Sequence, residues 1–396
     1  MKKKQMFVTI DSLGAAGAEK SLITFLSVLD YTRFDVDLQL FNYGGEFEKH
    51  IPKEVHVLPP FEYTEFANRS FVAQLKSMDF RKLCARLAFS LSLRKPYHLT
   101  NGAKARLYWK HVGPCLPAPA KTYDVAVAYA QGVPTLFVAG KVKAREKLSW
   151  VNVDYRLEGV NRDFQRPFYA EIDHIVPVSD SALRTFQGIY PEFAHKMTVI
   201  RDMLDANFIN RLAGEPMEKP MDTSVPALVT VARLNKDQKG YDITLEACRL
   251  LRDRGVRFHW YAVGRGPYRE EMERYLAEHH LQDVFHFVGA TPNPYPYISN
   301  ATLYVQTSRH EGYGLSIAEA RILNRPVVTT EFAGVYNQMV PGKNGLVVKM
   351  TPEAVADGVE RLLADKALYN AIQQYQMQEK KGNTEEIEKF YQLVEA

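Results

Sequence analysis

Two glutamates in the second half of the chain are spaced so that both could bind the hydroxyl groups of one ligand. Glu311 lies in the glycine-rich turn 308–314, and Glu319 follows after seven residues, in a short helix expected over 315–323. A buried strand expected over 301–307 precedes the turn. Such a strand, turn and helix start aim free backbone N–H groups and the helix dipole at a phosphate. N–H groups that bind a phosphate, together with carboxylates that bind hydroxyl groups, suit a nucleotide sugar. The alternative is a surface turn with two solvated glutamates.

A second loop, after a strand expected over 227–232, carries the cations that sugar transfer needs. The β-phosphate of a nucleotide donor gains negative charge as the glycosidic bond breaks, and fixed cations can offset that charge. Arg233 offers a planar fork for phosphate, and Lys239 offers a mobile point charge. No Asp-x-Asp motif stands on a loop of this half of the sequence. We therefore expect a reaction without a metal or another cofactor; a solvated basic loop is the alternative.

Glycines in a third loop and in the turn 308–314 would let the backbone approach a nucleotide closely. The residues expected to bind the donor there are Gly264, Gly266, Gly314, Leu315 and Ser316. Arg233, Gly264 and Glu311 each follow a strand of an alternating strand–helix pattern, which predicts a parallel sheet. Ligands bind at the carboxyl ends of such strands, so the three residues are expected at one sheet edge.

These stretches resemble the retaining glycosyltransferases of family 4. The resemblance rests on Glu311-Gly-Tyr-Gly-Leu, Glu319-Ala, Pro326-Val-Val-Thr-Thr and Gly342-Lys-Asn-Gly-Leu-Val, and on Ala16-Gly17-Ala18-Glu19 near the N-terminus. It implies the GT-B fold, in which two Rossmann-like domains with parallel sheets face each other across a cleft. It also implies that the loop holding Gly17 approaches the donor phosphates, although a plain strand–helix turn is the alternative for that loop.

The resemblance further implies roles for individual side chains. Arg233 and Lys239, rather than Lys236, match the pair that clamps the diphosphate. Glu311 would bind a hydroxyl of the transferring sugar, and Glu319 would bind the ribose. Transfer would retain the anomeric configuration, with the acceptor hydroxyl attacking beside the departing diphosphate, which takes its proton.

One departure from the family pattern concerns the end of a strand expected over 147–151. The family commonly has Trp-Ile/Val-His-x-Asp here, with the histidine near the anomeric carbon, and this chain has Asn152 at the histidine position. Asn152 cannot titrate, so a mechanism that depends on a histidine there is in doubt. A reaction that needs no protein base is compatible with Asn152, which remains a candidate catalytic residue.

The length of 396 residues predicts two domains of ordinary size. We expect an acceptor domain over 1–203, a linker over 204–226 and a donor domain over 227–383. The linker is inferred from weak periodicity and three prolines, Pro216, Pro220 and Pro226. A terminal helix over 384–396 is expected to pack back on the first domain. Within that domain, the last strand is expected over 197–201.

Charge, cysteine content and hydropathy indicate the expected cellular compartment and the expected classes of partner. A net charge of +4 is slight for this length and does not suggest a nucleic-acid partner. Three cysteines, an odd number without metal-ligand spacing, fit a reduced cytoplasmic compartment. The basic start is not read as a signal peptide, because Asp11 interrupts the apolar run that follows it. No stretch reaches the ~18 apolar residues of a membrane span.

Residues 71–121 form the one compositional anomaly, because they hold ten lysines and arginines against a single acid, Asp79. Within them Phe80–Lys95 predicts a basic amphipathic helix, whose apolar face comprises Phe80, Leu83, Cys84, Leu87, Ala88 and Leu91. Such a helix can lie in an anionic membrane interface, or it can pack its apolar face on the protein core.

The predicted function is that of a retaining glycosyltransferase in cell-surface polysaccharide synthesis. It would move a sugar from a nucleotide-diphosphate donor to a glycan or lipid-linked glycan. A non-catalytic glycan- or partner-binding subunit of the same fold, or a sugar-nucleotide epimerase, is the alternative. The epimerase is disfavoured because it would need acid and base residues that Asn152 does not supply.

Overall fold

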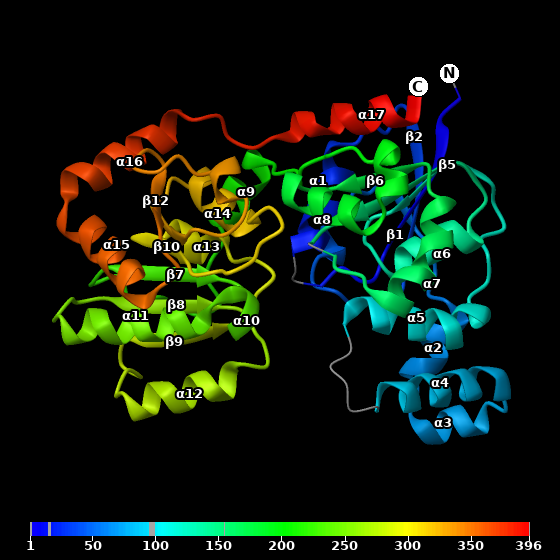
Figure 1. Cartoon of the computed structure of the whole chain (residues 1–396), viewed down its shortest axis with the longest axis horizontal. Helices are drawn as coiled ribbons and strands as arrows, with labels where there is room; N and C mark the ends of the chain where they lie inside the picture. The colour runs from blue at the N-terminus through cyan, green and yellow to red at the C-terminus, as the bar shows by residue number, and fades with distance from the viewer. Residues whose placement is uncertain (1, 15–16, 95–99, 154, 396) are drawn as a thin grey trace. The chain divides into compact units, whose positions relative to one another are not determined.

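The computed structural model describes residues 2–14, 17–94, 100–153 and 155–395. The chain forms two compact units, one from residues 1–203 with 385–396 and the other from residues 204–384 (Figure 1). Each unit has a six-stranded parallel sheet with helices packed on it. Both units are therefore Rossmann-like.

The sheet of the first unit has the strand order β3-β2-β1-β4-β5-β6. Its strands are β1 Lys4–Ile10, β2 Phe34–Leu40, β3 Val55–Val57, β4 Tyr123–Ala128, β5 Ala144–Val151 and β6 His174–Pro177. β1 pairs with β2 on one side and β4 on the other, so the winding direction of the chain reverses between β1 and β4. Open sheets of this kind bind ligands beyond the strand ends at that switch point.

The strand expected over 197–201 is absent from the described residues as a paired strand, and its prediction was wrong. The segment makes one isolated bridge, from Met197 to Ile175. The Thr198 N–H donates to the Ile175 carbonyl, and the Ile200 N–H donates to the Pro177 carbonyl. Pro177 has no N–H to donate in return, so the ladder cannot continue along β6.

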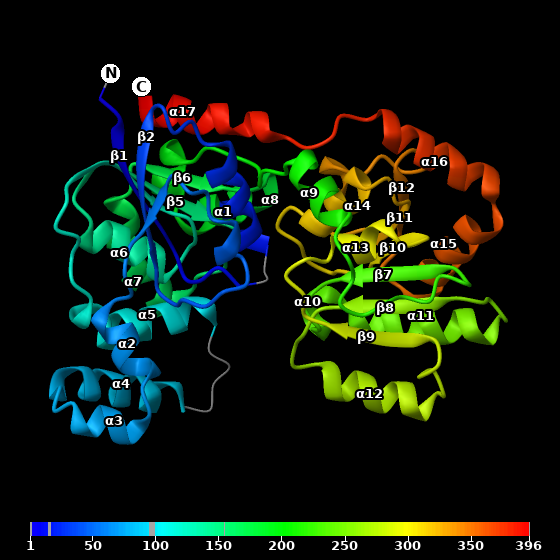
Figure 2. The ribbon, with the colours of Figure 1, turned by 180° about the vertical axis from the view of Figure 1, so that it is seen from behind.

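The helices of the first unit are α1 Gly17–Val28, α2 Glu62–Asn68, α3 Phe71–Lys76, α4 Phe80–Leu93, α5 Asn101–His111, α6 Val133–Lys141, α7 Gly159–Ala170, α8 Asp180–Ile189 and α17 Ile387–Glu395. Four of them, α2 to α5, form an insertion between β3 and β4, where the sequence favours helices over strands. Figures 1 and 2 both show α3 and α4 lying side by side at one end of this unit.

The C-terminal helix α17 packs into the first unit although its sequence follows the second. Phe390 meets Phe25 edge to face with ring centroids 5.0 Å apart, and the Tyr391 hydroxyl accepts a 2.9 Å hydrogen bond from the Asp30 N–H. Phe390 is fully buried. The apolar side chains that recur on one face of this segment explain why it returns to the first core.

The sheet of the second unit has the strand order β12-β11-β10-β7-β8-β9. Its strands are β7 Ala227–Val231, β8 His259–Val263, β9 Phe285–Gly289, β10 Leu303–Gln306, β11 Val327–Thr330 and β12 Gly345–Val348. Its helices are α9 Ala206–Ala213, α10 Lys236–Lys239, α11 Tyr241–Asp253, α12 Arg269–Glu278, α13 Tyr295–Ser299, α14 Leu315–Ile322, α15 Pro352–Ala364 and α16 Lys366–Gln378. No helix in the described part of the chain is long and apolar enough to cross a membrane.

The segment expected as a linker, 204–226, is part of the second unit. Asp205 caps α9 by accepting a 2.8 Å hydrogen bond from the Asn207 N–H. Ile209 and Leu212 of this helix are buried in the core, as is Met221 further along. The helix has only eight residues, so its periodicity is too brief to stand out among the prolines that follow.

The buried carboxyl group of Asp202, at the end of the first unit, makes the stability of that unit depend on pH. Burial raises the pKa of Asp202 to about 7, although a hydrogen bond with Ser21 acts in the opposite direction. The folded state therefore keeps a proton that the unfolded chain releases above its usual pKa of about 4, and the free energy of unfolding falls as the pH rises between these values.

We predict that Asp202→Asn removes this dependence, because the amide keeps the shape of the acid and never ionises. The variant should be more stable than the wild type at pH 8, by up to about 4 kcal/mol, and should differ little from it near pH 4. Urea unfolding followed by circular dichroism at several pH values measures this difference. Asp163→Asn on an exposed helix face is the control, and an equal gain in that variant at pH 8 would refute the prediction.

Candidate functional site

The loop that follows β7 carries both predicted cations of the second unit. A short helix, α10, forms in this loop because the Asn235 side chain accepts a 2.8 Å hydrogen bond from the Gln238 N–H. Lys239 is the last residue of α10. The helix ends there because Gly240 adopts the left-handed conformation, with φ of 64°.

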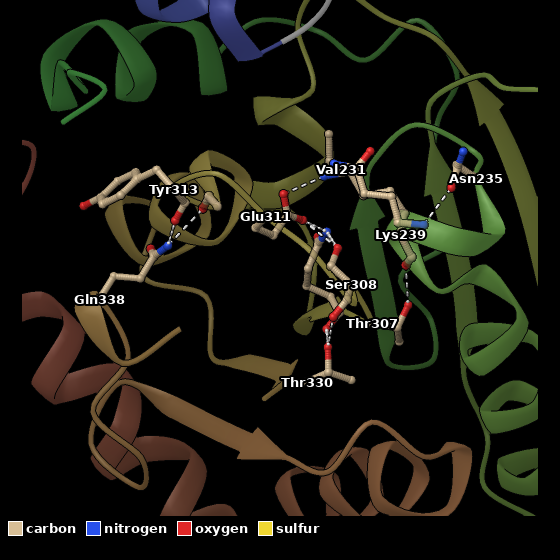
Figure 3. A network of polar contacts seen from close by, with 12 residues as sticks. Val231, Asn235, Lys239, Thr307, Ser308, Glu311, Tyr313, Thr330 and Gln338 are labelled. Carbon is tan, nitrogen blue, oxygen red and sulfur yellow. Dashed lines mark hydrogen bonds and ion pairs between the residues drawn. The ribbon is translucent and has the colours of Figure 1, made fainter. Parts of the chain in front are cut away.

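Lys239 and Glu311 form a largely buried ion pair (Figure 3). The Lys239 Nζ lies 2.6 Å from the Glu311 Oε2, and their side chains are 17% and 9% exposed. The other carboxylate oxygen, Oε1, accepts hydrogen bonds from the Ser308 hydroxyl at 2.6 Å and from the Gln306 Nε2 at 2.9 Å. Burying two charges is costly unless they form a pair and their other polar atoms are hydrogen-bonded. The Glu311 carboxylate meets this condition, because Lys239, Ser308 and Gln306 all donate to it.

Further hydrogen bonds hold the donors of Glu311 in place. The Tyr304 hydroxyl donates to the Gln306 Oε1 at 2.6 Å, and the Thr330 hydroxyl donates to the Ser308 carbonyl at 2.6 Å. Sequence reasoning missed Tyr304, Gln306 and Ser308. Gln306, a long polar side chain inside an otherwise apolar strand, was the signal that could have identified them.

The close approach of two loops brings Lys239 to Glu311. A Cβ atom on Gly240 would lie 2.1 Å from the Thr307 carbonyl oxygen, so this contact requires glycine. The Thr307 hydroxyl lies 3.0 Å from both the Lys239 and the Gly240 carbonyl oxygens. The Arg309 guanidinium adds a two-pronged contact to Asp242, at 2.8 and 2.7 Å, which fastens the same loops together.

Arg233 lies on the same loop as Lys239 but takes no part in the network. Its side chain is exposed, and it has no hydrogen-bond or ion-pair partner within the described residues. Lys236, the neighbour that we did not select, is exposed and lies 3.8 Å from Glu271. The structure thus presents one cation already paired with the candidate carboxylate and one available to a ligand.

Gly264 and Gly266 serve a different contact from the predicted one. A Cβ on Gly264 would lie 2.0 Å from the Ala232 carbonyl oxygen, and a Cβ on Gly266 would lie 2.2 Å from that of Leu234. The glycines therefore let the loop after β8 pack against the backbone of the loop after β7. Their expected approach to a nucleotide stays a prediction, whereas their approach to this neighbouring loop is observed.

The start of α14 is shaped by Gly314, which has φ of 82°. Its carbonyl oxygen accepts a 3.2 Å hydrogen bond from the Gln338 side chain, which also donates to the Tyr313 carbonyl. Leu315 and Ser316, the first residues of the helix, are half-buried. The N–H groups of a first helical turn have no acceptor within the helix, so they can serve a ligand.

Glu319 is fully buried in this structure. The Tyr295 hydroxyl donates a 3.1 Å hydrogen bond to its Oε1 atom, inside the core behind α14. Burial raises the pKa of Tyr295 well above its usual value, so this phenol is a donor at any ordinary pH. The Glu319 carboxylate faces inward in this structure, and its expected contact with a ribose stays a prediction.

Two candidate residues, Asn152 and Gly17, belong to the first unit. The Asn152 Nδ2 donates to the Tyr129 carbonyl at 2.8 Å, and its N–H donates to the Gln131 Oε1 at 2.9 Å. Asn152 thus joins the end of β5 to the end of β4 and orients Gln131, which sequence reasoning missed. Gly17 is the exposed first residue of α1, and the preceding residues 15–16 lie outside the described structure.

A family model matches part of the second unit. Residues 225–365 match the family described as Glycosyl transferases group 1. This range contains Arg233, Lys239, Glu311 and Glu319. The match covers the strands and helices from β7 to α15, which hold the Lys239–Glu311 network.

Curated relatives are similar over part of their length. The putative colanic acid biosynthesis glycosyltransferase WcaL of Salmonella typhimurium is 25% identical over 271 residues, which are 66% of this chain and 61% of that protein. The alpha-D-kanosaminyltransferase of Streptomyces kanamyceticus is 33% identical over 147 residues, 36% of this chain and 38% of the relative. The chain thus spans 61% of the length of the WcaL relatives it matches.

Solved structures resemble the chain over almost its whole length. Staphylococcus aureus TarM, crystallised with UDP and other ligands, has a TM-score of 0.67 at 14% identity, with 99% of this chain and 100% of that chain covered. Anabaena HepE in complex with UDP-glucose has a TM-score of 0.67 at 16% identity, with 99% and 98% covered. These likenesses concern the fold, and with the two parallel sheets they confirm the predicted α/β class of GT-B type.

We predict that Gly240→Ala destabilises the second unit far more than Gly255→Ala, its matched control. Both glycines have positive φ, at 64° and 75°, so both substitutions carry the cost of a left-handed alanine, about 1 kcal/mol. Only the Cβ at residue 240 would collide with a carbonyl oxygen, since a Cβ at Gly255 meets nothing within 4 Å. Urea unfolding of both variants measures the difference, and equal costs would contradict the proposed loop contact.

Proposed function

We propose that the chain is a retaining glycosyltransferase that moves a sugar from a nucleotide-diphosphate donor to a glycan or lipid-linked glycan acceptor in cell-surface polysaccharide synthesis. One observation carries this proposal: Lys239 and Glu311 form a desolvated, hydrogen-bonded pair beside the unpaired Arg233, within the segment that matches Glycosyl transferases group 1. The WcaL relatives are named for colanic acid biosynthesis, which supports the assignment to polysaccharide synthesis.

The geometry of the pair suits stabilisation of a departing diphosphate. Negative charge grows on the β-phosphate as the glycosidic bond breaks, and a cation already held in position stabilises that charge without reorganisation. Glu311 holds the Lys239 ammonium in this way, and the free Arg233 guanidinium supplies a second contact. The Glu311 carboxylate is also suited to accept a hydroxyl of the transferring sugar.

The proposed reaction needs neither a metal nor a protein base. The two side-chain cations take the place of a divalent ion, and the departing diphosphate takes the proton of the acceptor hydroxyl. Asn152 supports this account, because it is engaged with the Tyr129 carbonyl and with Gln131 and cannot take up a proton. Its role in the proposed mechanism is to position the strand ends and not to transfer a proton.

We predict that Arg233→Ala and Lys239→Ala each lower turnover about a hundredfold or more, the typical cost of losing a preorganised charge stabiliser. Release of UDP from UDP-glucose, with and without acceptor, gives the rate, and NMR of the product gives its anomeric configuration. Lys236→Ala, which removes an exposed cation from the same loop, should retain near-normal activity. Equal losses in all three variants, or an inverted product, would refute the proposed mechanism.

We also propose that the protein works at the cytoplasmic face of an anionic membrane, which α3 and α4 would contact. The face of α4 predicted to be apolar remains largely open to solvent, with Phe80 66% and Leu91 60% exposed. The helix packs instead through the buried Ala85 and through Phe89, which meets Tyr108 edge to face. The interpretation that the predicted apolar face packs on the core was therefore wrong for most of that face. Lys95, the last residue of the predicted helix, lies outside the described residues.

Helix α3 enlarges the same exposed apolar surface. The large apolar side chains exposed on the two helices and their connection are those of Phe71, Val72, Leu75, Met78, Phe80, Leu87, Leu91 and Leu93. Exposed lysines and arginines stand among them, namely Lys76, Arg81 and Arg94. Apolar side chains flanked by cations suit the interface of an anionic bilayer, where each cation contributes about 1 kcal/mol.

We predict that the protein sediments with vesicles of phosphatidylglycerol and phosphatidylcholine more strongly than with phosphatidylcholine alone, and that high salt weakens this binding. Met78→Gln combined with Phe80→Gln should abolish the binding. Met377→Gln is the control, because Met377 is 59% exposed but belongs to α16 of the second unit and not to α3 or α4. Binding that is equal for both vesicles and insensitive to salt would refute the proposal.

A further inference from the structure

The first unit contains a cavity of about 550 Å³ that the donor chemistry does not use. Its floor is formed by residues that follow three strands of the sheet: Asp11 after β1, Asn42 after β2 and Gln131 after β4. β1 and β4 are the neighbouring strands between which the winding direction reverses. The cavity therefore lies at the switch point, where open parallel sheets bind their ligands.

The helical insertion covers this cavity. Tyr63 of α2, Arg86 and Phe89 of α4, and Lys104 and Tyr108 of α5 line it. Aromatic rings can lie against the C–H face of a sugar ring, and amide side chains such as Asn42 and Gln131 can exchange hydrogen bonds with its hydroxyls. Apolar walls with a few placed polar groups are typical of small-molecule sites. The lining thus has the chemistry of a saccharide site.

Gln131 is held in a defined orientation at the floor of the cavity. Its Oε1 atom accepts the Asn152 N–H at 2.9 Å, so its amide nitrogen is directed elsewhere and can donate to a ligand. Asn152 is fixed in turn by its bond to the Tyr129 carbonyl. Residues of β4 and β5 together therefore set one hydrogen-bonding group of the cavity before any ligand arrives.

Two cations in the lining lack a carboxylate partner. Lys104 is exposed and makes no ion pair within the described residues, and Arg86 donates only to the Ala67 carbonyl, at 2.5 Å. The one acidic residue of the lining, Asp11, does not neutralise them. Its carboxylate forms no ion pair with Lys104 or Arg86 within the described residues.

The lining holds one carboxylate, that of Asp11, against the two cations. The Asp11 side chain can be reached by solvent through the cavity, but the protein atoms crowded around the carboxylate raise its pKa to about 6. With this pKa the Asp11 carboxylate is mostly ionised at neutral pH and offsets one of the two positive charges. The cavity therefore carries net positive charge, supplied by the two helices of the insertion.

We propose that this cavity is the acceptor site and that its ligand is a saccharide bearing an anionic group, a carboxylate or a phosphate, which Lys104 and Arg86 bind. The proposal rests on the proposed glycosyltransferase function and specifies the acceptor class. The sugar ring lies among the aromatic side chains, and its hydroxyls meet Asn42, Gln131 and Asp11. The anionic group lies toward the insertion, where the unpaired cations stand.

The test compares three probes that differ in charge: methyl β-glucuronide, glucose 6-phosphate and methyl β-glucoside. Saturation-transfer NMR and calorimetry measure their binding to the full chain. We expect at least one anionic probe to bind about tenfold or more tightly than the neutral glucoside, as one charge-assisted hydrogen bond provides. The stronger of the two anionic probes identifies the carboxylate or the phosphate as the group recognised.

Lys104→Gln should remove this preference and leave binding of the neutral glucoside unchanged. Lys110→Gln is the matched control, because Lys110 is exposed on the same helix but does not line the cavity. Equal binding of all three probes, no binding of any, or equal effects of the two lysine variants would overturn the proposal. UDP binding, followed by thermal shift in the same variants, should not change. If the wild type binds none of UDP, GDP and ADP, that result contradicts the proposed function and not the cavity assignment.

Discussion

The ion pair between Lys239 and Glu311 is the interaction on which the arrangement of the second unit depends. Two charges that are less than a fifth exposed persist only when each is paired and hydrogen-bonded. Ser308 and Gln306 meet this requirement for the carboxylate. Gly240 lets the Lys239 ammonium reach its partner, because a Cβ atom at residue 240 would collide with the Thr307 carbonyl oxygen and keep the two loops apart. Strand order, loop glycines and buried polar residues therefore combine to hold one charged pair at a sheet edge.

The same edge shows that glycines at a candidate ligand site can have a packing role. Gly264 and Gly266 allow the loop after β8 to lie against the carbonyl groups of Ala232 and Leu234. This contact positions the β7 loop, which carries Arg233 and Lys239. The two glycines thus affect the candidate site indirectly, because they position the loop that carries its two cations. A glycine near a phosphate motif does not by itself establish that a phosphate approaches it.

The helical insertion of the first unit gives that unit two distinct surfaces. Its inner side covers the cavity at the switch point and contributes Lys104, Arg86 and Tyr108. Its outer side, on α3 and α4, exposes apolar residues and cations. In the account proposed here, the first surface selects an anionic saccharide and the second holds the protein beside the membrane. A lipid-linked acceptor would need both surfaces, because its saccharide must be bound and its lipid lies in the membrane.

The sequence by itself determined the fold class, several element positions and the choice of Lys239 and Glu311 as candidate site residues. An alternating strand and helix pattern predicted the sheet of the second unit, and the strand expected over 227–232 is observed as β7 at Ala227–Val231. Local patterns are sufficient there because buried parallel strands are short apolar runs bounded by glycine or proline. They were insufficient over 204–226, where α9 is brief, and over 197–201, where Pro177 on the neighbouring strand prevents pairing.

Only the tertiary structure decided which candidate residues meet. Lys239 and Glu311 are far apart in sequence, and their contact depends on two loops converging beyond neighbouring strands. The sequence also did not predict which side chains are buried. Glu319 faces the core, whereas the apolar side of α4 faces solvent. The cavity in the first unit could not be predicted either, because its lining comes from strand ends and inserted helices that are separated along the chain. Contacts between distant segments are set by packing, which a local residue pattern does not encode.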